Sequence, residues 1–291
     1  MNQLVANAAI SAAIILLVGV GFALIYRVGR FFHFAHGAAF TAGAYMNLVF
    51  FRVFGLPQPL SATLSVLTCI ALGCTMELAV YRPLRKRSAS GVVQLVASLG
   101  LYILLTSLIS LAFGDQTESV RSATIAKGVS VAGARLTDIQ ITIIACAAVA
   151  ASMVAWALRY TKAGREFRAV ASDPELAAIT GVRSDRVILG AFAVGSGLAG
   201  IAGILVSLDV DMRPTMGLLP LLSAVVAVLV GGVGRVLGLV MGAILIASAQ
   251  NVGGWYLGQQ WREPVVFVVL LGFLFVRPEG VMGKKLTKAT V

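Results

Sequence analysis

Charged residues are scarce in this sequence, and their scarcity excludes most classes of soluble protein. Only 12% of the 291 residues are Asp, Glu, Lys or Arg, whereas a soluble domain carries about 25%. Hydrophobic residues make up 59% of the chain, and the mean hydropathy is +0.94. Apolar runs recur along the whole length, and a run of about 20 residues crosses the ~30 Å hydrocarbon layer of a bilayer. The sequence therefore predicts a single, all-α transmembrane domain over residues 1–291, embedded in a lipid bilayer.

Residues that bind metals or hydrolyse substrates are equally few. The two histidines, His33 and His36, and the three cysteines, Cys69, Cys74 and Cys146, do not have the spacing of a metal site. With only two histidines, neither a catalytic triad nor a zinc centre is assembled convincingly. No Walker A motif is present either. We therefore expect that the chain is not an enzyme and has no cofactor, metal or nucleotide of its own.

Nine apolar segments are predicted to be membrane helices. None alternates apolar with polar residues as the strands of a membrane barrel do. The segments are 4–26, 31–51, 59–81, 92–113, 139–158, 187–207, 218–233, 236–257 and 264–276. Segment 31–51 is rich in Gly, Ala and His, and a re-entrant path there would leave eight crossings. The predicted fold is thus a polytopic helical bundle with eight or nine transmembrane helices.

The basic residues indicate how the segments are oriented. The net charge is +11, but Lys and Arg lie in short loops without interleaved aromatics, which argues against nucleic acid as a partner. Nine crossings with the N-terminus outside place 17 of the 23 Lys and Arg in the cytoplasm, and eight crossings place 15 there. Because positive residues favour the cytoplasmic side, we prefer nine. Both arrangements put residues 82–91 and 159–186 in the cytoplasm.

A short helix is predicted within the basic stretch 159–186. Asp173 suits the N-cap, Pro174 suits the first helical position, and Gly181 suits the position after the last turn. Leu176 and Ile179 would share one apolar face. A two-turn helix is not stable alone, so this helix must lie against a partner. The predicted element comprises Asp173, Pro174, Glu175, Leu176, Ala177, Ala178, Ile179 and Gly181.

Polar groups inside apolar segments are costly in lipid and are candidates for a functional passage. Our candidates are His36, Gly37, Glu77 and Asn251, with His36 first because small residues flank it. A structural role is the alternative for each of them, and Glu77 is close enough in sequence to Arg82 for an ion pair. The two histidines and Glu77 would also suit the proton relay of a secondary carrier.

Small residues at every fourth position predict close helix packing. One such row is Gly195, Ala199 and Gly203, and a second is Gly234, Gly238 and Gly242. We expect these rows to pack helices within the bundle. A subunit interface and a solute passage remain open as alternatives.

Six stretches of sequence, in order from residue 22 to residue 283, match one family pattern. They are FALIYRVGRFFHFAHGAAFTAGAY (22–45), MELAVYRPLRKR (76–87), ASLGLYILLTSL (97–108), DPELAAITGVRSDRV (173–187), GGVGRVLGLVMGAIL (231–245) and FVRPEGVMG (275–283). Together they resemble the permeases of branched-chain amino acid ABC importers. Their spacing and the full Phe-Ala-His-Gly resemble the shorter of the two permease types in the high-affinity importer.

The resemblance implies a multi-pass subunit of a bacterial-type inner membrane and a set of partners. A second, usually different permease would complete the pore, and two cytoplasmic ATPases would hold the ATP and Mg. A periplasmic or lipid-anchored binding protein would deliver the solute. Residues Glu175 to Gly181 are similar to the Glu-Ala-Ala-x-x-x-Gly signature of importer permeases, which implies that this helix couples to an ATPase.

The resemblance leaves the solute open among small molecules. A branched-chain amino acid is the leading expectation, with other amino acids, urea and amides as alternatives. Two further functions remain in competition with the importer: a proton-coupled secondary transporter and a passive channel. The predicted short helix distinguishes the importer from both, because only an importer needs a docking element for an ATPase.

Overall fold

The computed structural model describes residues 1–120, 128–131, 133–277 and 280–282, and it confirms the predicted all-helical class. Among these residues, the regular β-structure is one small antiparallel hairpin of β1 (Val129–Val131) and β2 (Ala134–Leu136). Positions 278, 279 and 283 of the C-terminal motif and the tail after them lie outside the described residues.

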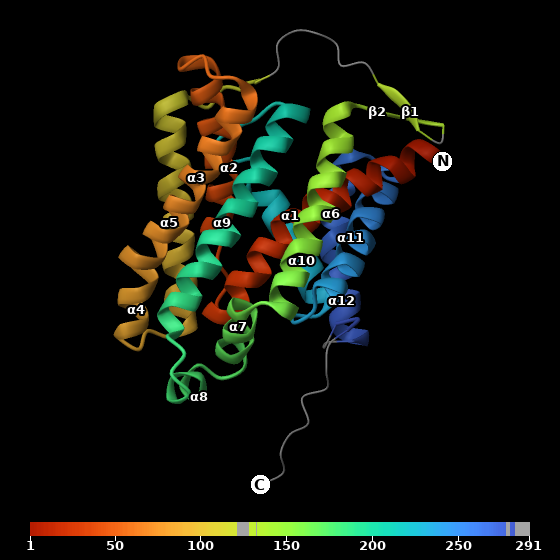
Figure 1. Ribbon diagram of the computed structural model, residues 1–291. Coiled ribbons are helices and arrows are strands. Elements are labelled where there is room, and N and C mark those ends of the chain that lie inside the picture. The colour runs from red at the N-terminus through yellow and green to blue at the C-terminus, as the bar shows by residue number, and fades with distance from the viewer. Residues whose placement is uncertain (121–127, 132, 278–279, 283–291) are drawn as a thin grey trace.

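Helices follow one another along the whole described chain (Figure 1). The first half contains α1 (Asn2–Gly29), α2 (Ala35–Leu48), the π-helical turn η1 (Val49–Val53), α3 (Gln58–Met76), the π-helical turn η2 (Glu77–Tyr81), α4 (Arg82–Lys86) and α5 (Gly91–Phe113). The second half contains α6 (Asp138–Tyr160), α7 (Lys162–Ser172), α8 (Pro174–Ile179), α9 (Ser184–Asp209), α10 (Leu218–Gly231), α11 (Val236–Tyr256), the 3₁₀ turn η3 (Gln259–Trp261) and α12 (Arg262–Val276).

Within the described residues, seven helical segments are long and apolar enough to cross a membrane. They are 2–29, 58–86, 91–113, 138–160, 184–209, 236–256 and 259–276. Segment 58–86 joins α3 to α4 through η2, which ends two residues before Pro83, a residue with no amide hydrogen to continue a regular helix. The predicted segments 31–51 and 218–233 correspond to the shorter helices α2 and α10, each of 14 residues.

Helix α1 runs from one end of the bundle to the other. Near its start, the Gln3 side chain accepts a hydrogen bond from the Arg135 amide of β2 at 3.0 Å. Just after its last turn, the Arg30 guanidinium donates to the Ser172 carbonyl oxygen, at the end of α7, at 2.9 Å. We call these ends the hairpin end and the α8 end, and Figure 1 shows them at opposite poles of the molecule.

The second segment returns from the α8 end toward the hairpin end. After α1, residues 30–34 form a short irregular link and α2 then begins at Ala35. At the far end of this segment, Arg52 of η1 pairs with Glu118, in the loop that leads from α5 toward the hairpin. The Glu118 backbone in turn bridges Met212. The segment formed by α2 and η1 therefore ends at the hairpin end and does not return to the α8 end, where it started.

Helices α1 and α9 form the centre of the bundle. Two-thirds of the apolar window of each is buried, compared with 22% for α5 and 6% for 259–276. Helix α9 packs on α1, α2 and α3, and α1 also packs on α6, α10 and α11. The peripheral helices α5, α6 and α12 instead expose large apolar side chains. In a bundle of membrane-crossing helices, such outer faces meet lipid or another membrane subunit.

Candidate functional site

The predicted short helix is present and its ends are formed as expected from sequence. The Asp173 carboxylate accepts hydrogen bonds from the amides of Glu175 (2.9 Å) and Leu176 (3.1 Å), which caps α8. Pro174 occupies the first helical position. Gly181 has a φ of 86°, in the left-handed region, and its amide donates to the Ala178 carbonyl oxygen. The helix ends at Ile179, and Thr180 is its C-cap.

Helix α8 turns its larger apolar side chains outward. Leu176 is 60% exposed and Ile179 is 82% exposed, whereas Ala177 is buried on the side facing the bundle. The Ser184 hydroxyl also donates to the Pro174 carbonyl oxygen at 3.3 Å, which joins the start of α8 to the start of α9. Helix α8 lies at one pole of the molecule (Figure 1), so Leu176 and Ile179 form a small apolar face at that pole.

Helix α7 was not predicted from the sequence. Its N-cap is Thr161, whose hydroxyl accepts a hydrogen bond from the Gly164 amide at 3.0 Å. Phe167 and Val170 are buried, at the i,i+3 spacing of one helix face. The Arg27 guanidinium lies 5.4 Å from the centre of the Phe167 ring. Two features of the sequence could have indicated α7: the Thr161 cap and the i,i+3 spacing of Phe167 and Val170.

A charge cluster connects the start of α9 to the end of α3–α4. Asp185 accepts a hydrogen bond from the Arg82 Nε atom at 2.9 Å and lies 3.5 Å from the Arg85 Nη2 atom. Arg85 also pairs with both carboxylate oxygens of Glu77, whose side chain is completely buried. The ion pair considered between Glu77 and Arg82 is therefore corrected: the partner of Glu77 is Arg85, and Arg82 pairs with Asp185. This cluster links α8, through α9, to the third segment.

The two histidines are buried where α1, α2, η2 and α9 meet. The His33 Nδ1 atom lies 3.0 Å from the Tyr81 hydroxyl, and the ring packs against Phe192 of α9. The His36 Nε2 atom lies 3.2 Å from the Val18 carbonyl oxygen, which can only accept, so Nε2 carries a hydrogen. Neither His33 Nε2 nor His36 Nδ1 has a hydrogen-bond partner among the described residues.

The other predicted passage residues make separate contacts. A Cβ at Gly37 would lie 2.9 Å from the Gly217 carbonyl oxygen, so Gly37 allows α2 to approach the start of α10. The Asn251 amide donates to the Ser11 hydroxyl of α1 at 3.1 Å and to the Ala247 carbonyl oxygen. Beside it, Gln250 donates to the Ser223 hydroxyl at 3.0 Å.

The first row of small residues lies at the centre of the bundle. A Cβ at Gly195 would lie 2.8 Å from the Gly21 carbonyl oxygen of α1. A Cβ at Gly203 would overlap the Phe40 carbonyl oxygen of α2, and Ala199 between them is completely buried. These three residues let α9 approach α1 and α2 at backbone distance.

The second row is only partly helical. Gly238 and Gly242 lie on α11 against the backbone of α10, at Gly231 and Ala227. Gly234 instead lies in the α10–α11 loop with a φ of 151° and with nothing within 4 Å of a Cβ placed there. The predicted role of Gly234 in helix packing is therefore corrected, because the helix ends at Gly231 and leaves that residue in a turn.

A bundle of long apolar helices with a capped short helix at one pole defines a multi-pass membrane protein as the class. Residues 4–276 match the family model described as branched-chain amino acid transport system, permease component. The chain belongs to this family.

Relatives match over nearly the whole chain. The high-affinity branched-chain amino acid transport system permease protein LivH of Escherichia coli (strain K12) is 26% identical, covering 92% of this chain and 91% of the relative. The corresponding BraD of Pseudomonas aeruginosa is 25% identical, covering 92% of this chain and 91% of BraD. The probable LivH of Methanocaldococcus jannaschii is 25% identical, covering 97% and 92%.

One solved structure supports the fold. PsaBC from Streptococcus pneumoniae, in complex with Fab, matches with a TM-score of 0.52 and 12% sequence identity, covering 94% of this chain and 91% of that chain. At this identity the similarity concerns the arrangement of helices alone.

Family membership confirms several predictions from the sequence. The chain is a non-catalytic, multi-pass subunit of a bacterial-type inner membrane, and such permease subunits carry no cofactor. It works with ATPase and substrate-binding-protein partners. The assignment to the shorter, LivH-like permease type is also confirmed.

Proposed function

We propose that this chain is the permease subunit of an ABC importer that moves a small amino acid of the branched-chain type. The observation that carries the proposal is α8, a capped two-turn helix with an outward apolar face. The solute class is supported by the relatives named for branched-chain amino acid transport, each covering at least nine-tenths of the chain.

Helix α8 is proposed as the element that docks on an ATPase subunit. Leu176 and Ile179 would enter a groove of the ATPase, since a helix this short needs a partner to bury its apolar face. When the ATPases close, α8 would move together with α9. The pairs of Asp185 with Arg82 and Arg85 would transmit that movement to segment 58–86.

The proposed topology has nine crossings with the N-terminus outside. It is supported by the path of α1 from the hairpin end to the α8 end and by the return of α2 with η1. It also places 17 of the 23 Lys and Arg in the cytoplasm. The α8 end is then cytoplasmic, where ATPases are located.

The proposed assembly contains a second, different permease, two ATPases and a periplasmic or lipid-anchored binding protein. We propose His36 and Gly37 as the passage residues of this chain, because they lie where α2 approaches α1 and α10. For Glu77 and Asn251 we propose a structural role, since each has side-chain partners on its own or a neighbouring segment.

The test is reconstitution with the products of neighbouring genes. We expect leucine-loaded binding protein to stimulate ATP hydrolysis and to drive leucine into proteoliposomes. Leu176→Asp and Gly181→Val should abolish uptake while the protein still reaches the membrane, because the first puts a charge on the docking face and the second strains a left-handed turn. Gly181→Asn is the matched control, since Asn tolerates that backbone conformation.

Two outcomes would contradict the proposal. The first is normal uptake by Leu176→Asp and Gly181→Val. The second is leucine transport by the isolated chain, driven by a pH gradient and lost in His36→Ala, which would identify a secondary carrier.

A further inference from the structure

Three arginines surround a hollow at the α8 end of the bundle. The hollow has a volume of about 570 Å³ and lies between the end of α1, the last turns of α7 and the α10–α11 loop. Arg27, Arg30 and Arg168 line it, and no carboxylate is among its lining residues. Three like charges around one space repel one another, and an anion placed between them would offset that repulsion.

The arginines are positioned by the protein but are not neutralised by it. Arg30 donates to the Ser172 carbonyl oxygen, and Arg27 lies over the Phe167 ring. Within the part of the chain that the structure describes, none of the three forms an ion pair with a carboxylate. Each guanidinium has five N–H donors, so donors remain for a ligand. Such groups bind phosphate oxygens in a bidentate manner.

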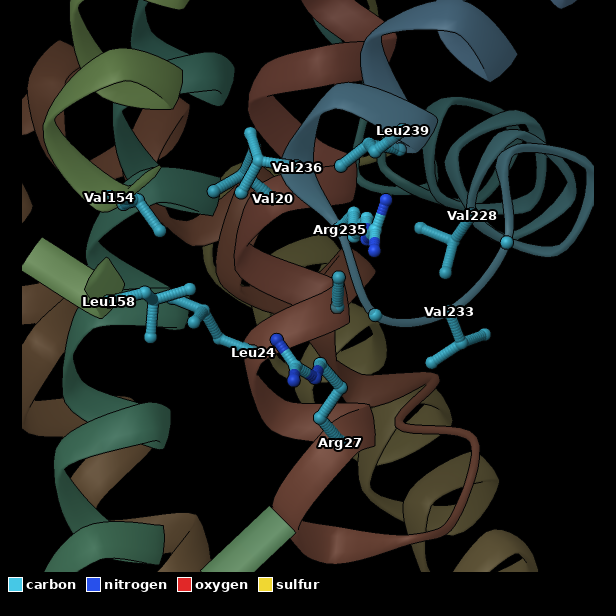
Figure 2. A pocket seen from close by; sticks show the side chains of 13 residues that line it. Val20, Leu24, Arg27, Val154, Leu158, Val228, Val233, Arg235, Val236 and Leu239 are labelled. Carbon is cyan, nitrogen blue, oxygen red and sulfur yellow. The ribbon is translucent and has the colours of Figure 1, made fainter. Parts of the chain in front are cut away.

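An apolar surface begins where the basic hollow ends. Figure 2 shows the adjoining pocket, in which Arg27 lies below Leu24 and Val233 of the α10–α11 loop lines the other side. Val154 and Leu158 of α6 form the opposite wall. A second groove, of about 280 Å³, shares Leu24, Val154 and Leu158 with this pocket and extends along α6 to α9. The hollow shares Arg27 and Val233 with the pocket in Figure 2, which has a volume of about 30 Å³, so the charged and apolar spaces adjoin one another.

We propose that this surface binds an anionic phospholipid. Its phosphate would lie among Arg27, Arg30 and Arg168, and an acyl chain would follow Leu24, Val154 and Leu158 along α6. A basic pocket between membrane helices, near the cytoplasmic surface, suits such a headgroup. Free phosphate would use only the charged hollow, and a polar acidic peptide would leave the apolar groove empty. The inference does not depend on which solute is transported.

The bound lipid would connect three elements that the sequence separates. Its headgroup would contact the end of α1, helix α7 and the α10–α11 loop together. Helix α7 directly precedes α8, so the lipid would stabilise the base on which the docking helix is held. We expect the bound lipid to favour one position of α7, and hence of α8, relative to the bundle.

The experiment measures binding of labelled phosphatidylglycerol to the purified full chain in phosphatidylcholine nanodiscs. Arg27→Gln, Arg30→Gln and Arg168→Gln are combined in one variant. The matched control combines Arg159→Gln, Arg165→Gln and Arg183→Gln, which removes three charges from the same end of the bundle but none from the hollow. The first variant should lose on the order of a hundredfold in affinity, and the control should lose much less.

Further arms use the unmodified protein and identify the ligand. Phosphatidylglycerol should bind more tightly than labelled phosphatidylcholine, and its binding should weaken as salt is raised. Inorganic phosphate and glycerol 3-phosphate should compete poorly, because they lack the apolar chain. Leu158→Ser should weaken lipid binding and leave the binding of inorganic phosphate unchanged.

Several results would overturn the proposal. Equal loss in the two triple variants would mean general attraction of lipid to a basic surface. Effective competition by inorganic phosphate would mean a phosphate site without a lipid. Unchanged lipid binding in the first variant, with loss of the ATPase subunits on co-purification, would mean that the hollow receives an acidic partner segment instead.

Discussion

Single residues stabilise this bundle mainly in two ways. Charged side chains form ion pairs, and small side chains let helices pack closely. Glu77 is completely buried, and its carboxylate forms an ion pair with Arg85, which lies two turns further along the same segment. Sequence spacing favoured Arg82 as its partner. A π-helical turn is wider than an α-helical turn, so η2 rotates every following residue relative to a regular helix. That rotation depends on structure around Pro83 and is not visible in residue spacing.

Removing Arg85 alone should be more harmful than removing the whole ion pair. Arg85→Met leaves the Glu77 carboxylate buried without its partner, which should cost about 3–5 kcal/mol of stability. Arg85→Met combined with Glu77→Gln should recover most of that loss. Thermal unfolding of the detergent-purified variants checks this order. A double variant no more stable than Arg85→Met would contradict the pairing.

At the scale of elements, apolar runs predicted the helices well and polar stretches predicted them poorly. The nine apolar segments all coincide with helices, and α8 was predicted from Asp173, Pro174 and Gly181. Helix α7 was missed because much of its sequence is polar and its only large apolar residues are Phe167 and Val170. Gly234 was assigned to a packing row because a four-residue spacing does not distinguish a helical glycine from one in a turn.

Close contacts between helices depend on which glycines face a neighbouring backbone. Only the structure shows which glycines these are. Gly203 and Gly190 both lie on α9, but only Gly203 faces a backbone oxygen, that of Phe40 on α2. Around Gly190 there is nothing within 4 Å of a Cβ position. The sequence placed Gly203 in a packing row without indicating which helix it would meet.

Gly203→Ala should separate α2 from α9, whereas Gly190→Ala should be tolerated. The added methyl group at Gly203 would overlap the Phe40 carbonyl oxygen, and overpacking of this kind costs about 1–3 kcal/mol. Thermal unfolding in the same detergent compares the two variants. An unchanged midpoint for Gly203→Ala, or an equal decrease for both, would contradict the contact.

At the scale of the whole molecule, the central question is which face of the membrane each end occupies. The sequence left eight and nine crossings open because segment 31–51 is rich in Gly, Ala and His and could be re-entrant. In the structure the start of α1 lies beside β2, and α8 lies at the other pole. An odd number of crossings places the N-terminus and the C-terminus on opposite sides of the membrane. An even number places them on the same side.

Cysteine labelling should separate the two topologies. In a background with Cys69, Cys74 and Cys146 replaced by serine, single cysteines are introduced as Asn2→Cys, Val129→Cys or Ile179→Cys. Each of these three positions is exposed in the isolated chain. In spheroplasts that express the chain without the ATPase subunits, a membrane-impermeant maleimide should label Asn2→Cys and Val129→Cys, and should label Ile179→Cys only after permeabilisation. Protection of Asn2→Cys together with labelling of Val129→Cys would establish eight crossings, because α1 would then begin in the cytoplasm. Direct labelling of Ile179→Cys would place α8 outside the cell, where an ATPase has no access to it.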